Sequence, residues 1–170
     1  MKRRLICAAI AAVTAAQAAA GAADTLVFTR TDGSLLPMRG KTYVWCGKWD
    51  DGRNVRALRI QQGSWPATRW WMFEVRVALA HRGQSIALPV LVGPTATMFV
   101  GDRRSHIEAS AESERSRGMA TFLADAGCRP GTQVRLSLRA TLASEQTGGP
   151  SVRVSGTFTG TVGTTPAPHP

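Results

Sequence analysis

The chain has 170 residues, with 21 Lys and Arg against 11 Asp and Glu, and 44% of the residues are hydrophobic. This composition is typical of a globular protein and excludes a disordered chain of low hydrophobicity. The 17 Gly and 9 Pro are scattered without a period, which excludes collagen and low-complexity linkers. The formal net charge of +10 indicates a strongly basic protein.

The N-terminus has the three parts of an export signal. Met1–Arg4 is positively charged, Leu5–Ala16 is apolar and rich in Ala, and Ala20–Ala22 offers a small-residue cleavage site. We therefore predict a cleaved signal peptide over residues 1–23 and export to the periplasm or the extracellular medium. The alternative is an uncleaved anchor, but this apolar stretch is short for a permanent span, and we expect no stable membrane span after cleavage.

Cleavage after residue 23 would leave 147 of the 170 residues, enough for one ordinary domain. This part carries 18 basic and 11 acidic side chains, a net charge of +7, and its only lysines are Lys41 and Lys48. We assign residues 24–163 to a single domain. The Pro- and Thr-rich residues 164–170 have no apolar periodicity and are expected to form a disordered tail.

Two cysteines, Cys46 and Cys128, remain after removal of the signal, and they lie 82 positions apart. In an oxidising compartment such a pair is most simply one structural disulfide. The alternative, a redox-active pair, lacks the close C-x-x-C spacing. The predicted bond would connect an early strand to a late one and so stabilise the whole domain.

Alternation of apolar and polar residues predicts strands along most of the domain. One long alternating run covers 69–80. The shorter strand candidates are 26–29, 42–49, 55–61, 85–92 and 96–100. Pro89 interrupts one of them, which indicates an edge strand or a bend. The clearest pattern is the pair 132–143 and 152–162, where two alternating runs flank a Gly-Pro turn and predict a hairpin.

The segment 108–126 is ambiguous between helix and strand. Glu108–Arg117 is polar enough for a short helix or an exposed loop, with acidic and basic side chains that could pair along a helix. Met119–Ala126 fits either a helix that ends at Gly127 or a strand that leads into Cys128. We favour the strand for this second part, because strands surround it.

These patterns predict an all-β protein, an antiparallel β-sandwich of immunoglobulin-like or jelly-roll-like type with one disulfide. An immunoglobulin domain would have a Tyr two residues before its second cysteine. Position 126 is Ala, and the only tyrosine, Tyr43, precedes Cys46. The sequence therefore supports a generic sandwich rather than immunoglobulin ancestry.

No residue pattern points to catalysis, to a metal or to a cofactor. The chain has no G-x-S-x-G or S-x-x-K motif, and no further carboxylates follow Asp50–Gly52 at the spacing of a calcium loop. His81 falls in a predicted turn, and His106 lies beside two arginines. Either could serve a small secreted hydrolase, which we keep as a minor alternative.

All five tryptophans fall between positions 45 and 71. Most of them could fill the sandwich interior near the disulfide. Alternatively, exposed indole rings could form a platform for sugar rings, because a pyranose has an apolar C–H face. The candidates for ligand contact are Trp45, Trp49, Trp65 and Trp70, and this platform would make the protein a carbohydrate-binding module.

Arginines supply a second candidate surface. Arg135, Arg139 and Arg153 fall on the polar side of the predicted hairpin, where guanidinium groups could hold phosphate or carboxylate groups. A solvated sheet face would have the same pattern. Export argues against nucleic acid as the partner. We therefore expect a non-enzymatic binding module of the cell envelope or medium, whose partner is an anionic envelope polymer, a glycan or another protein.

Overall fold

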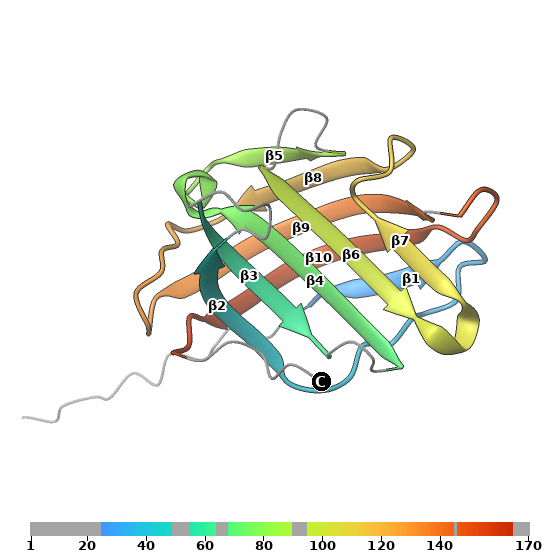
Figure 1. The fold of residues 1–170 in the computed structure, drawn as a ribbon, viewed down its shortest axis with the longest axis horizontal. Helices are drawn as coiled ribbons and strands as arrows, with labels where there is room; N and C mark the ends of the chain where they lie inside the picture. The colour runs from blue at the N-terminus through green and yellow to red at the C-terminus, as the bar shows by residue number, and fades with distance from the viewer. Residues whose placement is uncertain (1–24, 49–54, 64–67, 90–94, 145, 165–170) are drawn as a thin grey trace, which may run out of the picture.

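The computed structural model describes residues 25–48, 55–63, 68–89, 95–144 and 146–164, which form ten strands and two short 3-10 helices (Figure 1). The predicted signal peptide, most of the predicted tail, Trp49 and Trp65 lie outside these ranges. The elements in chain order are β1 (Val27–Arg30), β2 (Thr42–Lys48), β3 (Arg56–Gln62), β4 (Arg69–Arg76), η1 (Val77–Leu79), β5 (Ser85–Leu88), β6 (Ala96–Asp102), η2 (Arg103–Ser105), β7 (Ile107–Ser110), β8 (Arg117–Phe122), β9 (Gln133–Ser144) and β10 (Val152–Thr161).

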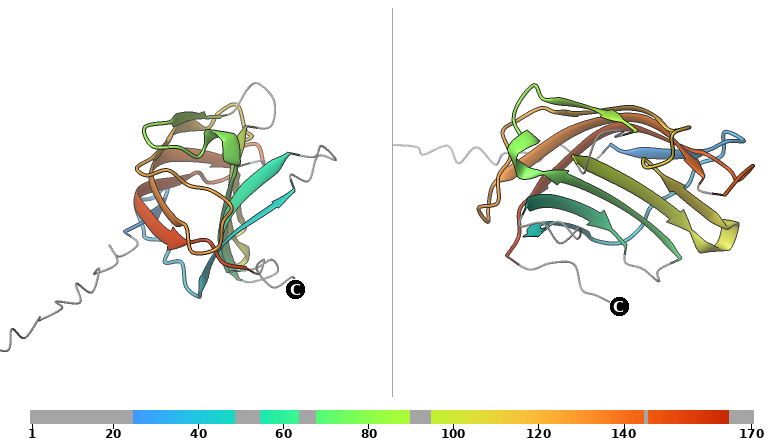
Figure 2. Two further views of the ribbon diagram at one scale, coloured as in Figure 1. Left: turned by 90° about the vertical axis from the view of Figure 1, so that its left-hand side faces the viewer. Right: turned by 45° about the horizontal axis from the view of Figure 1, so that its top comes forward.

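All strand pairs are antiparallel and form one curled sheet with two halves. Half-sheet A has the strand order β5-β8-β9-β10-β1, and half-sheet B has the order β2-β3-β4-β6-β7. The end of β9 joins them, because Ala109 of β7 pairs with Ser144 and Ser110 pairs with Ala143. Figure 1 shows half-sheet B crossing in front of half-sheet A, and Figure 2 shows the sheet curling around the interior.

The predicted all-β antiparallel architecture is therefore confirmed at the level of a curled, half-barrel sheet. The finer prediction of a sandwich is not established, because β7 and β9 link the two halves by backbone pairing instead of leaving two separate sheets. The pairing of β7 with β9 could not be predicted from the sequence, because the two strands lie far apart in the chain. The alternation within each strand does not show which other strand it pairs with.

The predicted hairpin is confirmed as β9 and β10, which pair over ten consecutive positions. Alternate residues of β9 from Val134 to Leu142 are buried, whereas Arg135 and Arg139 are exposed. This period of two is what a strand with one face against a core requires. The arginines of this hairpin therefore point away from the interior.

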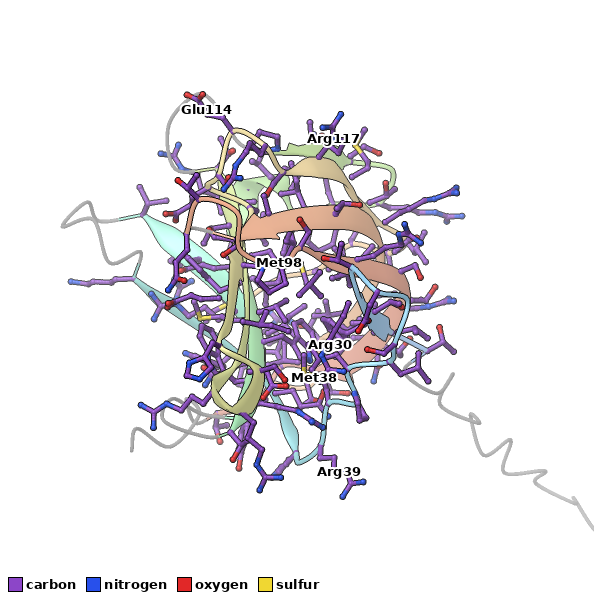
Figure 3. All side chains as sticks on the ribbon, turned by 90° about the vertical axis from the view of Figure 1, so that its right-hand side faces the viewer. Arg30, Met38, Arg39, Met98, Glu114 and Arg117 are labelled. Carbon is purple, nitrogen blue, oxygen red and sulfur yellow. A yellow bond between two sulfur atoms is a disulfide. The ribbon has the colours of Figure 1, made fainter. Side chains whose placement is uncertain are left out.

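The core lies between the two half-sheets, and Trp71 is at its centre. Its side chain is fully buried, and its ring lies 5.7 Å from the ring of Phe28 in β1 and 6.0 Å from that of Phe158 in β10. The indole Nε1 donates a 2.9 Å hydrogen bond to Oε1 of Gln62, so the only polar atom of the ring is satisfied. Figure 3 shows the fully buried Met98 in the interior and Arg117 pointing away from it.

The predicted disulfide is confirmed, since Cys46 in β2 is bonded to Cys128 with a Cα–Cα distance of 5.4 Å. It connects half-sheet B to the segment between β8 and β9. The bond encloses 82 positions of the sequence, so it restricts the unfolded chain strongly. Among the described residues, no helix has both the length and the apolar character that a membrane crossing requires.

Three predicted boundaries are corrected. The segment 108–117, expected as a helix or loop, begins with strand β7, in which Ile107 and Ala109 are buried and Glu108 is exposed. The strand expected over 69–80 ends at Arg76, and η1 follows it. The strand preferred for 119–126 exists as β8, but it starts at Arg117 and ends at Phe122. Strand β7 has only four residues, and in β8 the apolar Met119 is exposed, so neither strand has a clear alternation in the sequence.

Candidate functional site

The outer surface of half-sheet A carries four exposed arginines, which we call the Arg face: Arg117 on β8, Arg135 and Arg139 on β9, and Arg153 on β10. Three of them were predicted as ligand contacts from the sequence. Arg117 was not, because it falls in the ambiguous segment 108–126. The pairing of β8 with β9 places Arg117 directly opposite Thr141, on the same face as the other three arginines.

The strand register brings three of these arginines together around Thr141. Arg117 and Arg153 lie directly opposite Thr141 on the two neighbouring strands, and Arg139 is two positions along β9 from it. Arg139 is therefore a diagonal neighbour of both other arginines, at a Cα distance of about 7–8 Å. Such a cluster can bring several guanidinium groups to one anionic chain.

The charge of half-sheet A is of one sign. Its five strands contain five arginines and no Asp or Glu. By contrast, the strands of half-sheet B contain five basic and three acidic residues. Within the described part of the chain, the guanidinium groups of Arg117, Arg135, Arg139 and Arg153 make no hydrogen bond or ion pair. Their donors are thus open to a ligand.

Other arginines serve the structure instead. Nε of Arg59 lies 2.7 Å from Oε1 of Glu74, and its Nη2 donates to the carbonyl oxygen of Lys48 at 2.9 Å. The side chains of this ion pair are only 15% and 6% exposed. The pair lies on the outer surface of half-sheet B, next to Trp45, which is opposite Arg59 in the register.

The tryptophans do not form the predicted platform within the described residues. Trp45 is 8% exposed, and Trp71 is fully buried in the core. Trp70 is half-buried on the outer surface of half-sheet B. Trp49 and Trp65 lie outside the described ranges. Packing therefore accounts for Trp45 and Trp71, and Trp70 is the described tryptophan with partial access to solvent.

A cleft of about 360 Å³ lies beside Trp70, and we call it the Trp70 cleft. Its walls come from β4, β6 and the chain that follows, and they include Trp70, Gly101, Asp102, Arg103, His106 and Glu108. Trp70, Gly101 and Glu108 stand in one row across three adjacent strands. The volume is within the range of small-molecule sites.

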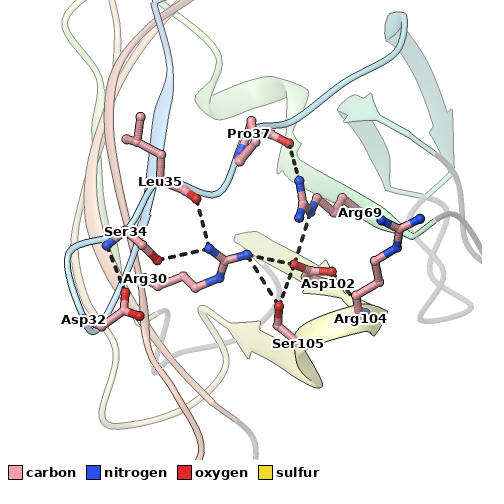
Figure 4. A network of polar contacts seen from close by, with 9 residues as sticks. All are labelled: Arg30, Asp32, Ser34, Leu35, Pro37, Arg69, Asp102, Arg104 and Ser105. Carbon is pink, nitrogen blue, oxygen red and sulfur yellow. Dashed lines mark hydrogen bonds and ion pairs between the residues drawn. The ribbon is translucent and has the colours of Figure 1, made fainter.

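The carboxylate of Asp102 organises the base of this region (Figure 4). Its Oδ2 accepts hydrogen bonds from Arg30 Nη2 at 3.2 Å, Arg69 Nε at 3.1 Å and Ser105 Oγ at 3.1 Å. Its Oδ1 accepts from the backbone N–H of Arg104 at 3.1 Å, which caps the start of η2. The network connects β1, β4 and β6, and it could not be predicted from local sequence patterns, since its members lie up to 75 positions apart.

Two opposing effects set the charge state of Asp102. Burial by itself raises the pKa of the carboxyl group, because a low-dielectric environment disfavours the charged form. The hydrogen bonds from Ser105, Arg30 and Arg69 outweigh burial and hold the pKa of Asp102 below its ordinary value. The group is therefore ionised at neutral pH, as a fully buried carboxylate between two guanidinium groups should be.

Neither histidine is part of a hydrogen-bonded catalytic group in the described ranges. His81 and His106 are both exposed. His106 adopts a left-handed conformation with φ of 49° at the end of η2. No group of three or more His, Cys, Asp or Glu side chains suited to a metal occurs among the described residues. Comparisons with protein-family models, curated proteins and solved structures give no match.

Proposed function

We propose that this protein is an exported, non-enzymatic binding module of the cell envelope or medium, and that its Arg face contacts an anionic polymer. The observation that carries the proposal is the unbalanced charge on the outer surface of half-sheet A, where four exposed arginines lie on strands that contain no Asp or Glu. Outward arginines alone would also fit a solvated face, but the absence of Asp and Glu from these strands favours a binding surface, because solvated faces usually carry charges of both signs. The export part rests on the sequence of residues 1–23.

The physical basis of binding is the geometry of the guanidinium group. Arginine presents its donors as a planar fork that matches phosphate and carboxylate groups with two parallel hydrogen bonds. Between the arginines lie hydroxyl side chains, such as Ser137 and Thr141, that can donate to the same polymer. A strand surface with exposed charges at regular intervals suits an extended chain better than a compact ligand.

The test compares the binding of fluorescently labelled polyphosphate, polygalacturonate and dextran, measured by anisotropy at several salt concentrations. The double variant Arg139→Gln/Arg153→Gln removes half of the Arg face. The matched control is Arg82→Gln/Arg129→Gln, which has the same net charge and changes two exposed loop residues. Because none of these four side chains makes a hydrogen bond or ion pair within the described fold, each variant should stay folded.

We expect the anionic polymers to bind and dextran to fail. Four neutralised charges on a linear polyanion give a slope of log K against log salt of about −3, and the face variant should show about half of it. The same variant should lose affinity by up to about thirtyfold, since each of the two exposed contacts contributes up to about 1 kcal/mol. An equal loss in the loop control would show that net charge alone drives binding and would overturn the proposal.

A glycan is the second candidate ligand, because Trp70 is partly exposed and borders a cleft. An extended aromatic platform has less support, since Trp45 is nearly buried. Binding of dextran that persists at high salt would support this second candidate. Binding to neither polymer class would favour another protein as the partner.

A further inference from the structure

We propose that the anionic polymer bound by the Arg face is linked to a lipid, and that the protein also contacts the acyl chains at the lipid end of this polymer. The proposal rests on the proposed function, because it uses the same arginines, and it adds an apolar part to the ligand. Three features support it: the positions of the exposed apolar side chains, an apolar groove beside β1, and the order in which apolar and basic side chains follow one another across the sheet.

All the large apolar side chains that are exposed in the described part of the chain lie beside the arginines of half-sheet A. They are 37–64% exposed: Val27, Leu35, Met119 and Leu123. Within the same ranges, the strands of half-sheet B have no large apolar side chain that is exposed. Single exposed apolar residues are ordinary in a soluble protein. Their gathering around one group of arginines instead indicates a surface that contacts both anionic and apolar groups.

The pairing of β8 with β9 places two of these side chains next to arginines. Met119 on β8 lies directly opposite Arg139 on β9. Beyond the end of β8, the backbone N–H of Leu123 donates a 2.9 Å hydrogen bond to the carbonyl oxygen of Arg135. Val27 on β1 lies in the same row as Arg139, two strands away. Side chains that are directly opposite share one face of a sheet, with Cβ atoms about 5 Å apart. A ligand on Arg139 therefore has an apolar side chain within reach.

The next row of the sheet ends in the fourth apolar side chain. Arg153 on β10 lies opposite Thr29 on β1, and Leu35 forms a β-bridge with Thr29 on the other side. Leu35 is the most exposed of the four, and Figure 4 shows its side chain pointing away from the Asp102 network. The arginines thus lie in the middle of the surface, with Met119 on one side of them and Leu35 on the other.

An apolar groove of about 340 Å³ lies beside β1. Seven of its eight lining residues are apolar, including Val27 and Leu35, and none of the eight is charged. The other one is Gln62, whose amide already donates to the carbonyl oxygen of Gly40 and accepts from the indole of Trp71. Such a lining favours an acyl chain, because a hydroxyl or charged group would lose its hydrogen bonds to water there.

The order of side chains favours an acylated polymer over a protein partner. A protein interface has an apolar core surrounded by a polar rim. On this surface the arrangement is reversed, because the arginines are central and the apolar side chains lie around them. Central guanidinium groups can bind the phosphate groups of the polymer. Separate apolar side chains and the groove can receive acyl chains, which have no fixed shape that the protein must match.

The test compares lipoteichoic acid, a polymer of glycerol phosphate with an acylated end, with the same polymer after alkaline removal of its acyl chains. Each form competes with fluorescently labelled polyphosphate for the protein, followed by anisotropy below the concentration at which micelles form. The readout is the ratio of the two affinities, which separates the apolar contribution from that of charge. Vesicles of phosphatidylglycerol are a third competitor, with lipid phosphate but no polymer.

Met119→Gln removes the apolar side chain opposite Arg139, and Leu35→Gln removes the one beside the groove. Met72→Gln is the matched control, because Met72 is half-buried on the outer surface of half-sheet B. Both test positions are exposed, so thermal unfolding of these variants should be unchanged.

We expect the acylated form to bind roughly tenfold more tightly than the deacylated form, the change that burial of about two methylene groups gives. This ratio should persist at high salt, because salt screens charges and not apolar contacts. Met119→Gln and Leu35→Gln should each reduce the ratio roughly fivefold, whereas Met72→Gln should leave it unchanged. An equal reduction in Met72→Gln would contradict the proposed location of the acyl chains.

Failure of this inference can be distinguished from failure of the Arg face. Equal affinity for the two forms would refute the contact with acyl chains, while the Arg face would stand if Arg139→Gln/Arg153→Gln weakened the binding of the deacylated form. If neither form displaced polyphosphate, the polymer proposal would fall as well. Vesicles that bound as tightly as the acylated polymer would show that lipid phosphate is sufficient, and a lipid surface would replace the lipid-linked polymer as the partner.

Discussion

Asp102→Asn is the sharpest test of how this fold is held together. The change keeps the size of the side chain and removes its charge. Three donors converge on Oδ2, from Arg30, Arg69 and Ser105. An amide nitrogen at that position cannot accept any of them. If the amide is turned around, the nitrogen instead meets the N–H of Arg104. Either orientation leaves donors without acceptors.

The expected loss of unfolding free energy follows from the burial of the three charged groups. Breaking a buried ion pair by removing one partner costs about 3–5 kcal/mol. Here the carboxylate is fully buried, but the side chains of Arg30 and Arg69 are 21% and 27% exposed, so water can partly solvate them after the change. We therefore expect a loss of about 3 kcal/mol, which corresponds to a melting temperature lower by roughly 10 °C.

Urea unfolding followed by circular dichroism measures this loss at neutral pH, and Asp32→Asn is the control. Asp32 accepts a hydrogen bond from the N–H of Ser34 at 2.9 Å, but it is exposed, so its replacement should have a much smaller effect. The slope of free energy against urea should be the same in all three proteins. A shift of less than about 1 kcal/mol for Asp102→Asn would refute the reasoning, because the network would then contribute no more than a surface pair.

The stability difference between the unmodified protein and Asp102→Asn should depend on pH. Because the pKa of Asp102 is lower in the folded protein than in the unfolded chain, its ionisation contributes stability above the unfolded pKa of about 3.9. The contribution disappears as the pH falls through the folded pKa. The stability difference between the protein and Asp102→Asn should therefore be constant from pH 5 to 7, as approximate limits, and shrink in more acidic buffer.

Three further outcomes are expected. Replacing Cys46 and Cys128 by Ser should lower the free energy of unfolding by about 2–4 kcal/mol, measured by urea unfolding, since the bond closes a loop of 82 positions. Glu74→Gln should cost about 2–4 kcal/mol in the same assay, because its arginine partner is left largely buried. After expression with export, mass spectrometry should find a chain that begins at Ala23 or Asp24, and an uncut chain would contradict the predicted signal.

Strand positions were predictable where alternation was long. The alternation over 132–143 correctly predicted which residues of β9 face the core and which face outward, and so it placed Arg135 and Arg139 on the outer surface. Strand β7 has only four residues, and its exposed Glu108 disguised two buried neighbours. A period needs several repeats to be distinguished from chance, so short strands with charged outer residues were missed.

Which residues come together in the candidate sites was harder to predict from the sequence than the positions of the strands. The outward direction of Arg153 follows from its own strand, but its approach to Arg117 depends on the pairing of β8, β9 and β10. The burial of Trp45 could not be predicted from its strand alone. Alternation placed Trp45 and Cys46 on different faces of the strand, but it did not show what packs over either face. Contacts within a strand are local properties of the sequence, whereas contacts across strands are properties of the register.

The two half-sheets use their arginines differently. In half-sheet B, carboxylates occupy positions beside arginines: Glu74 is opposite Arg59, and Asp102 is opposite Arg69. These arginines are used to hold the sheet together. In half-sheet A, Arg30 of β1 joins the Asp102 network, whereas the four arginines of the Arg face form no ion pair among the described residues. Replacing the four arginines of the Arg face should therefore leave stability nearly unchanged, and under the proposed function it should weaken binding.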